Sequence, residues 1–206
     1  MLQIENGCVM NFINALRGMR NPLDSWHLND SSEVGGVVSV GEKDLDLARR
    51  LCKAGSDHRK FMRQILVSVD INAPIYWWKE FDTYKVATVS NSCSTMHTIH
   101  KQPITAALFS TDGLSDESRS AFDAFLAYLE SLRLRFNESK DAAVWREIIL
   151  LLPSSFNQKR TITMNYETLL GIYHARKSHK LTEWHVLCDW ILTLPYFADI
   201  TGIEHT

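Results

Sequence analysis

The chain has 206 residues, of which 45% are hydrophobic and 22% are charged. These values are ordinary for a globular protein that is long enough to bury a substantial core, and they exclude the disordered and fibrous classes. The formal net charge of -2 gives no electrostatic reason to expect binding to nucleic acid or to an acidic membrane surface. Any basic site must therefore be local.

The four cysteines lie far apart and include no Cys-x-x-Cys pair, which is typical of a reducing compartment rather than of a disulfide scaffold. The N-terminus lacks the basic, apolar and small-residue pattern of a signal peptide. No segment approaches the roughly twenty apolar residues that span a bilayer. We therefore expect a cytoplasmic protein with one domain over 1–206, divided into an N-terminal arm and loop at 1–41 and a main body at 42–195.

The first half of the chain predicts a loop or short hairpin, then a helix, then a strand. Residues 29–41 are rich in Ser and Gly and predict the loop or hairpin. A helix is expected from Glu42 to Cys52, with Gly55 ending it from a C′ position. Ile65–Ile71 alternates apolar and polar residues, as a half-buried strand does. The aromatic segment that follows, PIYWWKEF, receives no assignment.

The second half is mainly helical. Apolar residues at helical spacing predict a helix from Ser115, its N-cap, to Phe136. Another helix from about Ala142 ends at Leu152, because Pro153 restricts the residue before it. A short strand is expected at 161–164, and two helices at 165–176 and 182–194. Helices outweigh strands, which indicates an α/β or α+β arrangement.

Basic residues gather at the end of the helix expected at 165–176. Asn165 and Arg176 are eleven positions apart, so on a continuous helix they would share one face, about 16 Å apart along the axis. Four further residues surround Arg176: His174, Lys177, His179 and Lys180. The helix dipole favours cations at a C-terminus, so the cluster indicates either a solvated group that complements the dipole or an anion-binding site.

The same segment resembles the flavin-dependent thymidylate synthases. That family carries a Leu-Pro element, a short strand, then Asn-x-Arg-Ser-Leu and a second Arg eleven residues after the Asn. This chain has Leu152-Pro153, then TMNYETL at 163–169, then Arg176. The resemblance implies that Arg176 binds and polarises a uracil nucleotide near Asn165, as the catalytic residue of an active enzyme. Glu167 replaces the first Arg, so a phosphate contact is either lost or moved to Lys177 or Lys180.

The middle of the chain resembles the same family less fully. Gly55 and Phe61 match residues of its Gly-His turn, and the segment at 83–97 matches part of its Arg-rich signature, with Thr83 and Met96 in the places of two arginines. The resemblance assigns contacts to the flavin dinucleotide FAD to six residues: His58, Arg63, Lys85, Thr88, Asn91 and Ser94. Losing the planar guanidinium groups removes charge-assisted hydrogen bonds to phosphate, so we expect weakened flavin binding.

The resemblance implies the family's fold, with a mixed or antiparallel sheet packed with several helices, and a homotetramer. It implies binding of a pyrimidine deoxynucleotide similar to dUMP, and flavin as a cofactor. If the chain is an enzyme, the implied reaction is flavin-dependent transfer of a methyl or hydroxymethyl group to a deoxyuridine nucleotide, with the participation of folate and NADPH left open. The alternative is a non-catalytic nucleotide-binding or interaction protein on the same fold.

Two further patterns leave alternatives open. Cys93, His97 and His100 have spacing that could ligate zinc, but no second pair of ligands accompanies them, so we predict no metal site. A Cys-His hydrolase is formally possible, but any chain with four Cys and eight His offers Cys-His pairs by chance. Trp77 and Trp78 either belong to the core or stack on a flat ring.

Overall fold

The computed structural model of the protein describes residues 2–204. It contains nineteen strands, α-helices and 3-10 helices within those residues. In chain order they are β1 (Gln3–Met10), α1 (Phe12–Gly18), η1 (Asn21–Leu23), η2 (Trp26–Leu28), β2 (Ser32–Val34), β3 (Val37–Ser39), α2 (Glu42–Lys53), η3 (Lys60–Arg63), β4 (Leu66–Pro74), α3 (Ile75–Phe81), β5 (Val89–Ser92), α4 (Thr95–Thr98), η4 (Ala106–Leu108), α5 (Asp116–Ser139), α6 (Ala142–Leu151), β6 (Asn157–Asn165), α7 (Tyr166–Arg176), α8 (Thr182–Leu192) and α9 (Phe197–Thr201).

A four-stranded sheet has the order β1-β4-β6-β5, and β2 and β3 form a separate antiparallel hairpin. In β4 the side chains of Val67, Val69 and Ile71 are buried, which confirms the alternation expected for that strand. The strand at 161–164 is confirmed and is longer than predicted. The predicted turn at 29–41 is a hairpin, because Gly35 and Gly36 both take positive φ between β2 and β3.

The described chain divides into two compact units. We call the first the α5 unit; it contains Leu2, Gln3, Ile71–Thr83 and Asn91–Thr161. The second, the α7 unit, contains Ile4–Asp70, Tyr84–Ser90 and the described residues from Ile162 to Glu204. Strands β1, β4, β5 and β6 each contribute residues to both units.

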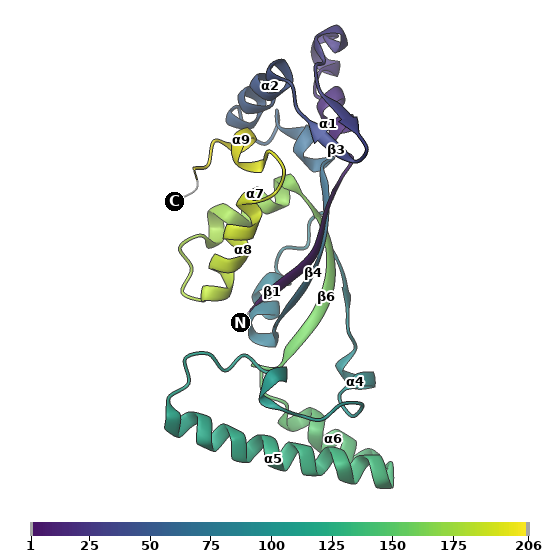
Figure 1. Cartoon of the computed structure of the whole chain (residues 1–206), viewed down its shortest axis with the longest axis vertical. Helices are drawn as coiled ribbons and strands as arrows, with labels where there is room; N and C mark the ends of the chain where they lie inside the picture. The colour runs from purple at the N-terminus through teal and green to yellow at the C-terminus, as the bar shows by residue number, and fades with distance from the viewer. Residues whose placement is uncertain (1, 205–206) are drawn as a thin grey trace. The chain divides into compact units, whose positions relative to one another are not determined.

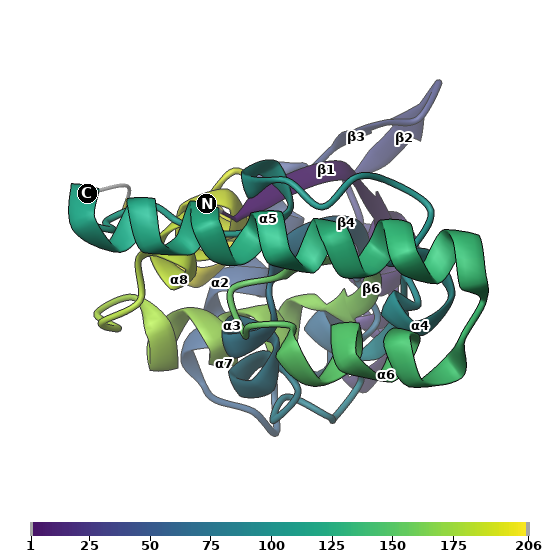
Figure 2. The same cartoon turned by 90° about the horizontal axis from the view of Figure 1, so that it is seen from below.

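Helices α5 and α6 pack side by side in the α5 unit, as Figures 1 and 2 both show. The Ser115 hydroxyl accepts from the Ser118 N–H, which confirms the cap expected for α5, and the Asp141 carboxylate caps α6 by accepting from the Ala143 N–H. The aromatic segment left unassigned is helix α3. Trp77 and Trp78 are fully buried in it with their rings 4.8 Å apart, so the structure assigns them to the core.

The α7 unit holds the remaining long helices, α2, α7 and α8. Helix α2 ends at Lys53, and Gly55 follows with φ of 103°, as the C-terminal glycine predicts. Helix α8 packs along α7, and α9 packs along α2 (Figure 1). The core of this unit includes the fully buried rings of Trp184, Tyr166 and Phe197.

The described residues show neither a membrane-spanning helix nor a cluster of metal ligands. No helix within residues 2–204 is both long enough and apolar enough to cross a membrane. The same residues contain no group of three or more His, Cys, Asp or Glu side chains that could hold a metal ion. Cys93, which the sequence pairs with His97 and His100, instead lies 3.8 Å from the Thr98 hydroxyl through its sulfur.

Candidate functional site

Arg176 is the last residue of α7, and two aromatic side chains hold its guanidinium group. The Nε–H donates to the Tyr84 hydroxyl at 2.8 Å. The guanidinium carbon lies 4.5 Å from the ring centroid of Trp184 and 5.5 Å from that of Tyr84. Trp184 is fully buried, whereas Arg176 keeps partial exposure. A planar cation held over a buried indole ring and a partly exposed phenol ring is pre-oriented to meet an anionic or strongly polar ligand, because little side-chain entropy is left to lose.

The loop after Arg176 is also held by hydrogen bonds. The Leu181 N–H donates to Nδ1 of His179, and Nε2 of His185 lies 2.7 Å from the His179 carbonyl oxygen. The His179 ring contacts Trp184 edge-on. Lys177 and Lys180 are exposed on the same loop. The predicted nucleotide-binding residues Arg176, Lys177 and Lys180 therefore lie together at the end of α7.

Asn165 is the N-cap of α7, and its amide is used inside the protein. Its Oδ1 accepts from the Thr168 N–H at 2.9 Å, and its Nδ2 donates to the Arg63 carbonyl at 3.3 Å. Its backbone is extended, with φ of -127°, so it precedes the helix. The helix expected at 165–176 therefore begins one residue later, with Asn165 as its cap, and the shared face of Asn165 and Arg176 stays a prediction. The role of Asn165 as a nucleotide ligand stays a prediction.

Glu167 occupies the position of the family's first Arg, and it pairs with a cation of its own. Its Oε2 lies 2.7 Å from Nε of Arg59, with side-chain exposures of 19% for Glu167 and 24% for Arg59. Cys52 lies beside this pair, and burial raises the pKa of its thiol. Because Glu167 is ion-paired with Arg59, neither side chain is available as a cation for a phosphate.

The six residues predicted to contact flavin divide between the two units. His58, Arg63, Lys85 and Thr88 belong to the α7 unit, and Asn91 and Ser94 belong to the α5 unit. Three of them have local roles. Arg63 donates to the Ser56 carbonyl, Thr88 donates to the Val86 carbonyl, and Ser94 precedes the short helix α4. Lys85 and Asn91 are exposed, and their predicted roles stay predictions.

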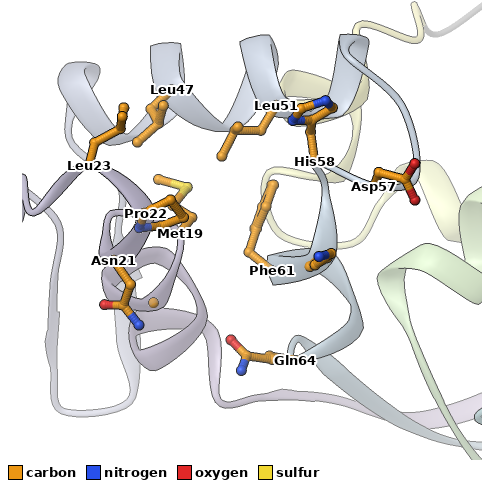
Figure 3. Close-up of a pocket in the computed structure, with 12 residues that line it drawn as sticks. Met19, Asn21, Pro22, Leu23, Leu47, Leu51, Asp57, His58, Phe61 and Gln64 are labelled. Atoms are coloured by element: carbon orange, nitrogen blue, oxygen red, sulfur yellow. The ribbon is translucent and has the colours of Figure 1, made fainter.

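His58 lines a cavity of about 490 Å³ in the α7 unit (Figure 3). Leu47 and Leu51 point into it from α2, toward Met19 and Phe61 on the opposite wall. The polar lining residues include two carboxamides, one carboxylate and one amine: Asn21, Gln64, Asp57 and Lys60. A cleft of this size with apolar walls and a few polar groups is typical of a site for a small organic molecule.

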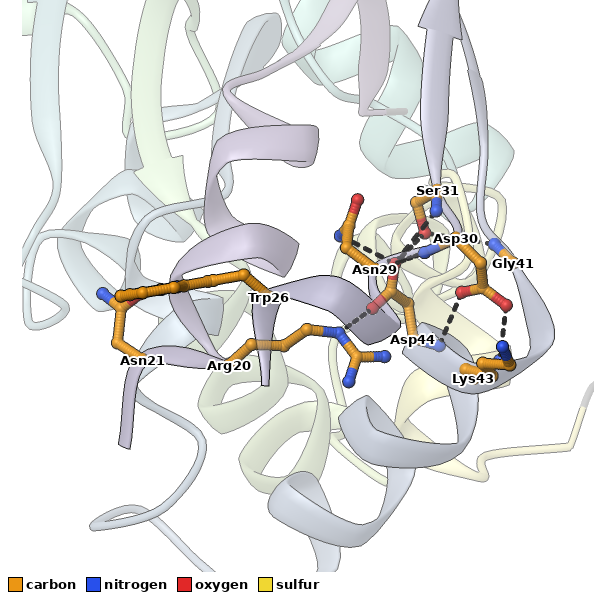
Figure 4. A network of polar contacts seen from close by, with 9 residues as sticks. All are labelled: Arg20, Asn21, Trp26, Asn29, Asp30, Ser31, Gly41, Lys43 and Asp44. Atoms are coloured by element: carbon orange, nitrogen blue, oxygen red, sulfur yellow. Dashed lines mark hydrogen bonds and ion pairs between the residues drawn. The ribbon is translucent and has the colours of Figure 1, made fainter. Parts of the chain in front are cut away.

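A buried polar network holds the two walls of this cavity together (Figure 4). Arg20, next to the wall residues Met19 and Asn21, is ion-paired with Asp44 of α2. The Asp44 carboxylate also accepts from the Asn29 amide and the Ser31 hydroxyl. The Asp30 carboxylate accepts from the backbone N–H groups of Lys43 and Asp44, and so caps α2 in place of Gly41, which has no side chain.

Sequence reasoning missed the aromatic residues that hold Arg176 and the carboxamides of the cavity. Tyr84 lies in the segment that resembles the family's signature, but spacing alone gives no sign that it meets Trp184 at Arg176. Asn21 and Gln64 carry no local pattern at all. Only the fold brings them together.

Comparison with known proteins supports the fold. No protein-family model matches the sequence, and no curated protein matches it significantly. Two structures of flavin-dependent thymidylate synthase from Helicobacter pylori, each complexed with FAD and dUMP, are similar in three dimensions. The first is 17% identical, with 97% of each chain covered and a TM-score of 0.70. The second is 16% identical, with 98% of this chain and 97% of that chain covered and a TM-score of 0.71.

A third similar structure is a UMP/dUMP methylase, PolB, from Streptomyces cacaoi, bound to 5-Br dUMP. It is 15% identical, with 98% of this chain and 92% of that chain covered and a TM-score of 0.63. At identities of 15–17% the similarity establishes the fold alone, and the similarity extends over 97–98% of this chain. The protein therefore has the fold of the flavin-dependent thymidylate synthases, as a strongly diverged example of it.

Proposed function

We propose that the protein binds a pyrimidine deoxynucleotide similar to dUMP at the end of α7, with Arg176 as the residue that recognises the uracil ring. The observation that carries this proposal is the geometry of Arg176, whose Nε–H meets the Tyr84 hydroxyl at 2.8 Å over the buried Trp184 ring. The similar structures contain dUMP or its bromo derivative, which supports a nucleotide of this class. Lys177 and Lys180 are the cations available to the phosphate, because Glu167 is paired with Arg59.

Titration calorimetry with dUMP tests this proposal on four forms of the protein: wild type, Arg176→Ala, Arg176→Lys and Arg146→Ala. A hydrogen bond to a charged group contributes about 1.5–3 kcal/mol, so Arg176→Ala should weaken binding roughly 10- to 100-fold. Arg176→Lys keeps the charge but loses the planar guanidinium group, so its affinity for dUMP should lie between those of wild type and Arg176→Ala. Arg146 is exposed on α6 and serves as the matched control. Absence of dUMP binding by the wild type, or equal affinity in Arg176→Ala, would rule the proposal out.

We propose binding rather than synthase activity. Flavin-dependent methylation would need Arg176 to stabilise negative charge on the uracil ring while a flavin is held beside it. The segment at 83–97 supplies Lys85 as its only Lys or Arg, so a diphosphate receives few charge-assisted hydrogen bonds there. We expect that the gene does not restore growth without thymidine to a bacterium that lacks thymidylate synthase. Growth that depends on Arg176 would favour the enzyme instead.

We further propose a cytoplasmic homo-oligomer, a tetramer by analogy with the family. All four cysteines are free thiols, in keeping with a reducing compartment. Several valines are strongly exposed on the isolated chain, including Val86 and Val89 at 85% and 70%. Large exposed apolar side chains that lie close together are typical of surfaces that a partner covers. Light scattering on the purified protein measures the number of subunits directly.

A further inference from the structure

The walls of the cavity beside α2 are apolar and include one aromatic ring. Leu47, Met19 and Phe61 are each less than 8% exposed and form the apolar floor of the cavity, whose polar rim at Asn21 and Gln64 is open to solvent. Leu51 adds a second leucine from α2 (Figure 3). Leucine side chains on one wall and a phenyl ring on the other suit a flat heterocycle, which buries two large faces without needing partners for them.

The polar groups of the cavity stand at its ends. Asn21 and Gln64 lie near each other at the side away from α2, and His58 and Asp57 lie near the end of α2 (Figure 3). The Asn21 oxygen accepts from the Trp26 indole N–H at 2.7 Å, which orients that amide. No hydrogen bond among the described residues engages the Gln64 carboxamide. A carboxamide presents one acceptor beside one donor, and so can pair with the N–H and one carbonyl oxygen of an imide edge.

The charge of the cavity argues against a diphosphate. Among the described residues that line it, Lys60 is the only Lys or Arg and Asp57 the only carboxylate, so with His58 neutral their formal charges cancel. A flavin dinucleotide carries a negative charge on each phosphate, and such groups are bound by clusters of Arg and Lys or by helix N-termini. Arg59 and Arg63, on the same segment as His58, are engaged with Glu167 and with the Ser56 carbonyl. The donor set therefore fits a ring but does not fit the dinucleotide.

We propose that this cavity binds a planar heterocycle with an imide edge and an uncharged tail, of which riboflavin is the nearest common example, in preference to FAD. The inference is independent of the nucleotide proposed at Arg176, because none of the residues that line the cavity belongs to that site. It assigns the ring recognition to Gln64 and Asn21 and the stacking to Phe61. The tail extends toward His58 and Asp57.

Quenching of flavin fluorescence measures the affinities of the full-length protein for riboflavin and FAD separately. We expect the dissociation constant for riboflavin to be lower than that for FAD, since the diphosphate brings negative charge to a cavity whose described lining has no cluster of cations. A dissociation constant for riboflavin equal to or higher than that for FAD would overturn the proposal, and so would failure of riboflavin to bind.

Variants locate the site. Leu51→Trp fills the cavity and should weaken riboflavin binding at least tenfold, and Gln64→Leu, at an exposed position, should weaken it several-fold. Leu150→Trp makes the same change on the exposed face of α6 and should have no effect. Unchanged riboflavin affinity in Gln64→Leu would overturn the assignment. Arg176→Ala should leave riboflavin binding intact while dUMP binding falls, so failure of one proposal is distinguishable from failure of the other.

Discussion

Arg59 and Glu167 form an ion pair, with Nε and Oε2 2.7 Å apart, that joins the residue before η3 to the first turn of α7. The pair explains why a carboxylate can stand where the thymidylate synthases carry an arginine. Glu167 lies at the N-terminus of α7, where the helix dipole favours negative charge, and Arg59 neutralises it. With Glu167 at this position, the chain has no cation there to bind a ligand, and instead gains an ion pair within the α7 unit.

We expect a measurable coupling between these two side chains. Because both are about four-fifths buried, removal of the pair should show a coupling energy of about 1 kcal/mol, above the value usual for exposed pairs. Urea denaturation of Arg59→Ala, Glu167→Ala and the double variant gives this energy. The exposed pair Arg50–Asp46 is the control and should show little coupling. Equal coupling in the two pairs would contradict the role assigned to Arg59.

Tyr84→Phe should weaken dUMP binding without unfolding the protein. The substitution keeps the ring that stacks near Arg176 but removes the hydroxyl that accepts from its Nε–H. We expect a loss of about three- to tenfold, corresponding to one ordinary hydrogen bond of about 1 kcal/mol. Calorimetry with dUMP measures it, with Tyr128→Phe on the exposed surface of α5 as control. Equal affinity in Tyr84→Phe and wild type would show that the hydroxyl does not position Arg176.

Two glycines should respond to alanine in opposite directions. A Cβ at Gly41 would overlap the side chain and carbonyl of Asp30, the residue that caps α2, so Gly41→Ala should destabilise the protein by about 2 kcal/mol or more. Nothing lies within 4 Å of a Cβ at Gly171 in α7, so Gly171→Ala should add about 0.5–1 kcal/mol of stability. Thermal unfolding decides both. A stabilised Gly41→Ala variant would mean that the Asp30 cap is dispensable.

Acid should destabilise the protein in part through Glu130. Its pKa is lowered by the hydrogen bond from Arg133, an effect that burial opposes and the Ile104 N–H reinforces. A carboxyl with a lowered folded pKa contributes stability above its unfolded pKa of about 4.3, and loses that contribution as the pH falls through the folded value. The stability difference between wild type and Glu130→Gln should therefore be full at pH 7 and shrink below about pH 4. Denaturant titrations across this range measure it, and a constant difference would contradict the prediction.

Most of the helices could be predicted from the sequence because their signals are local. The Ser115 cap, the glycine at 55 and Pro153 mark the ends of α5, α2 and α6 through backbone geometry that no distant residue needs to supply. The alternation of apolar and polar residues in β4 is likewise a local signal that predicts a half-buried strand. The aromatic segment of α3 was not, because a short helix buried on all sides shows no periodicity.

The sequence by itself determined the Ser115 cap of α5, the glycine after α2 and the half-buried strand β4, since each depends on residues close together in the chain. Only the tertiary structure decided that Tyr84 and Trp184 meet at Arg176 and that Arg59 neutralises Glu167. Residues 92 and 108 positions apart make two of these contacts. Such contacts arise from the packing of whole elements, and packing carries no signature in the local order of residues.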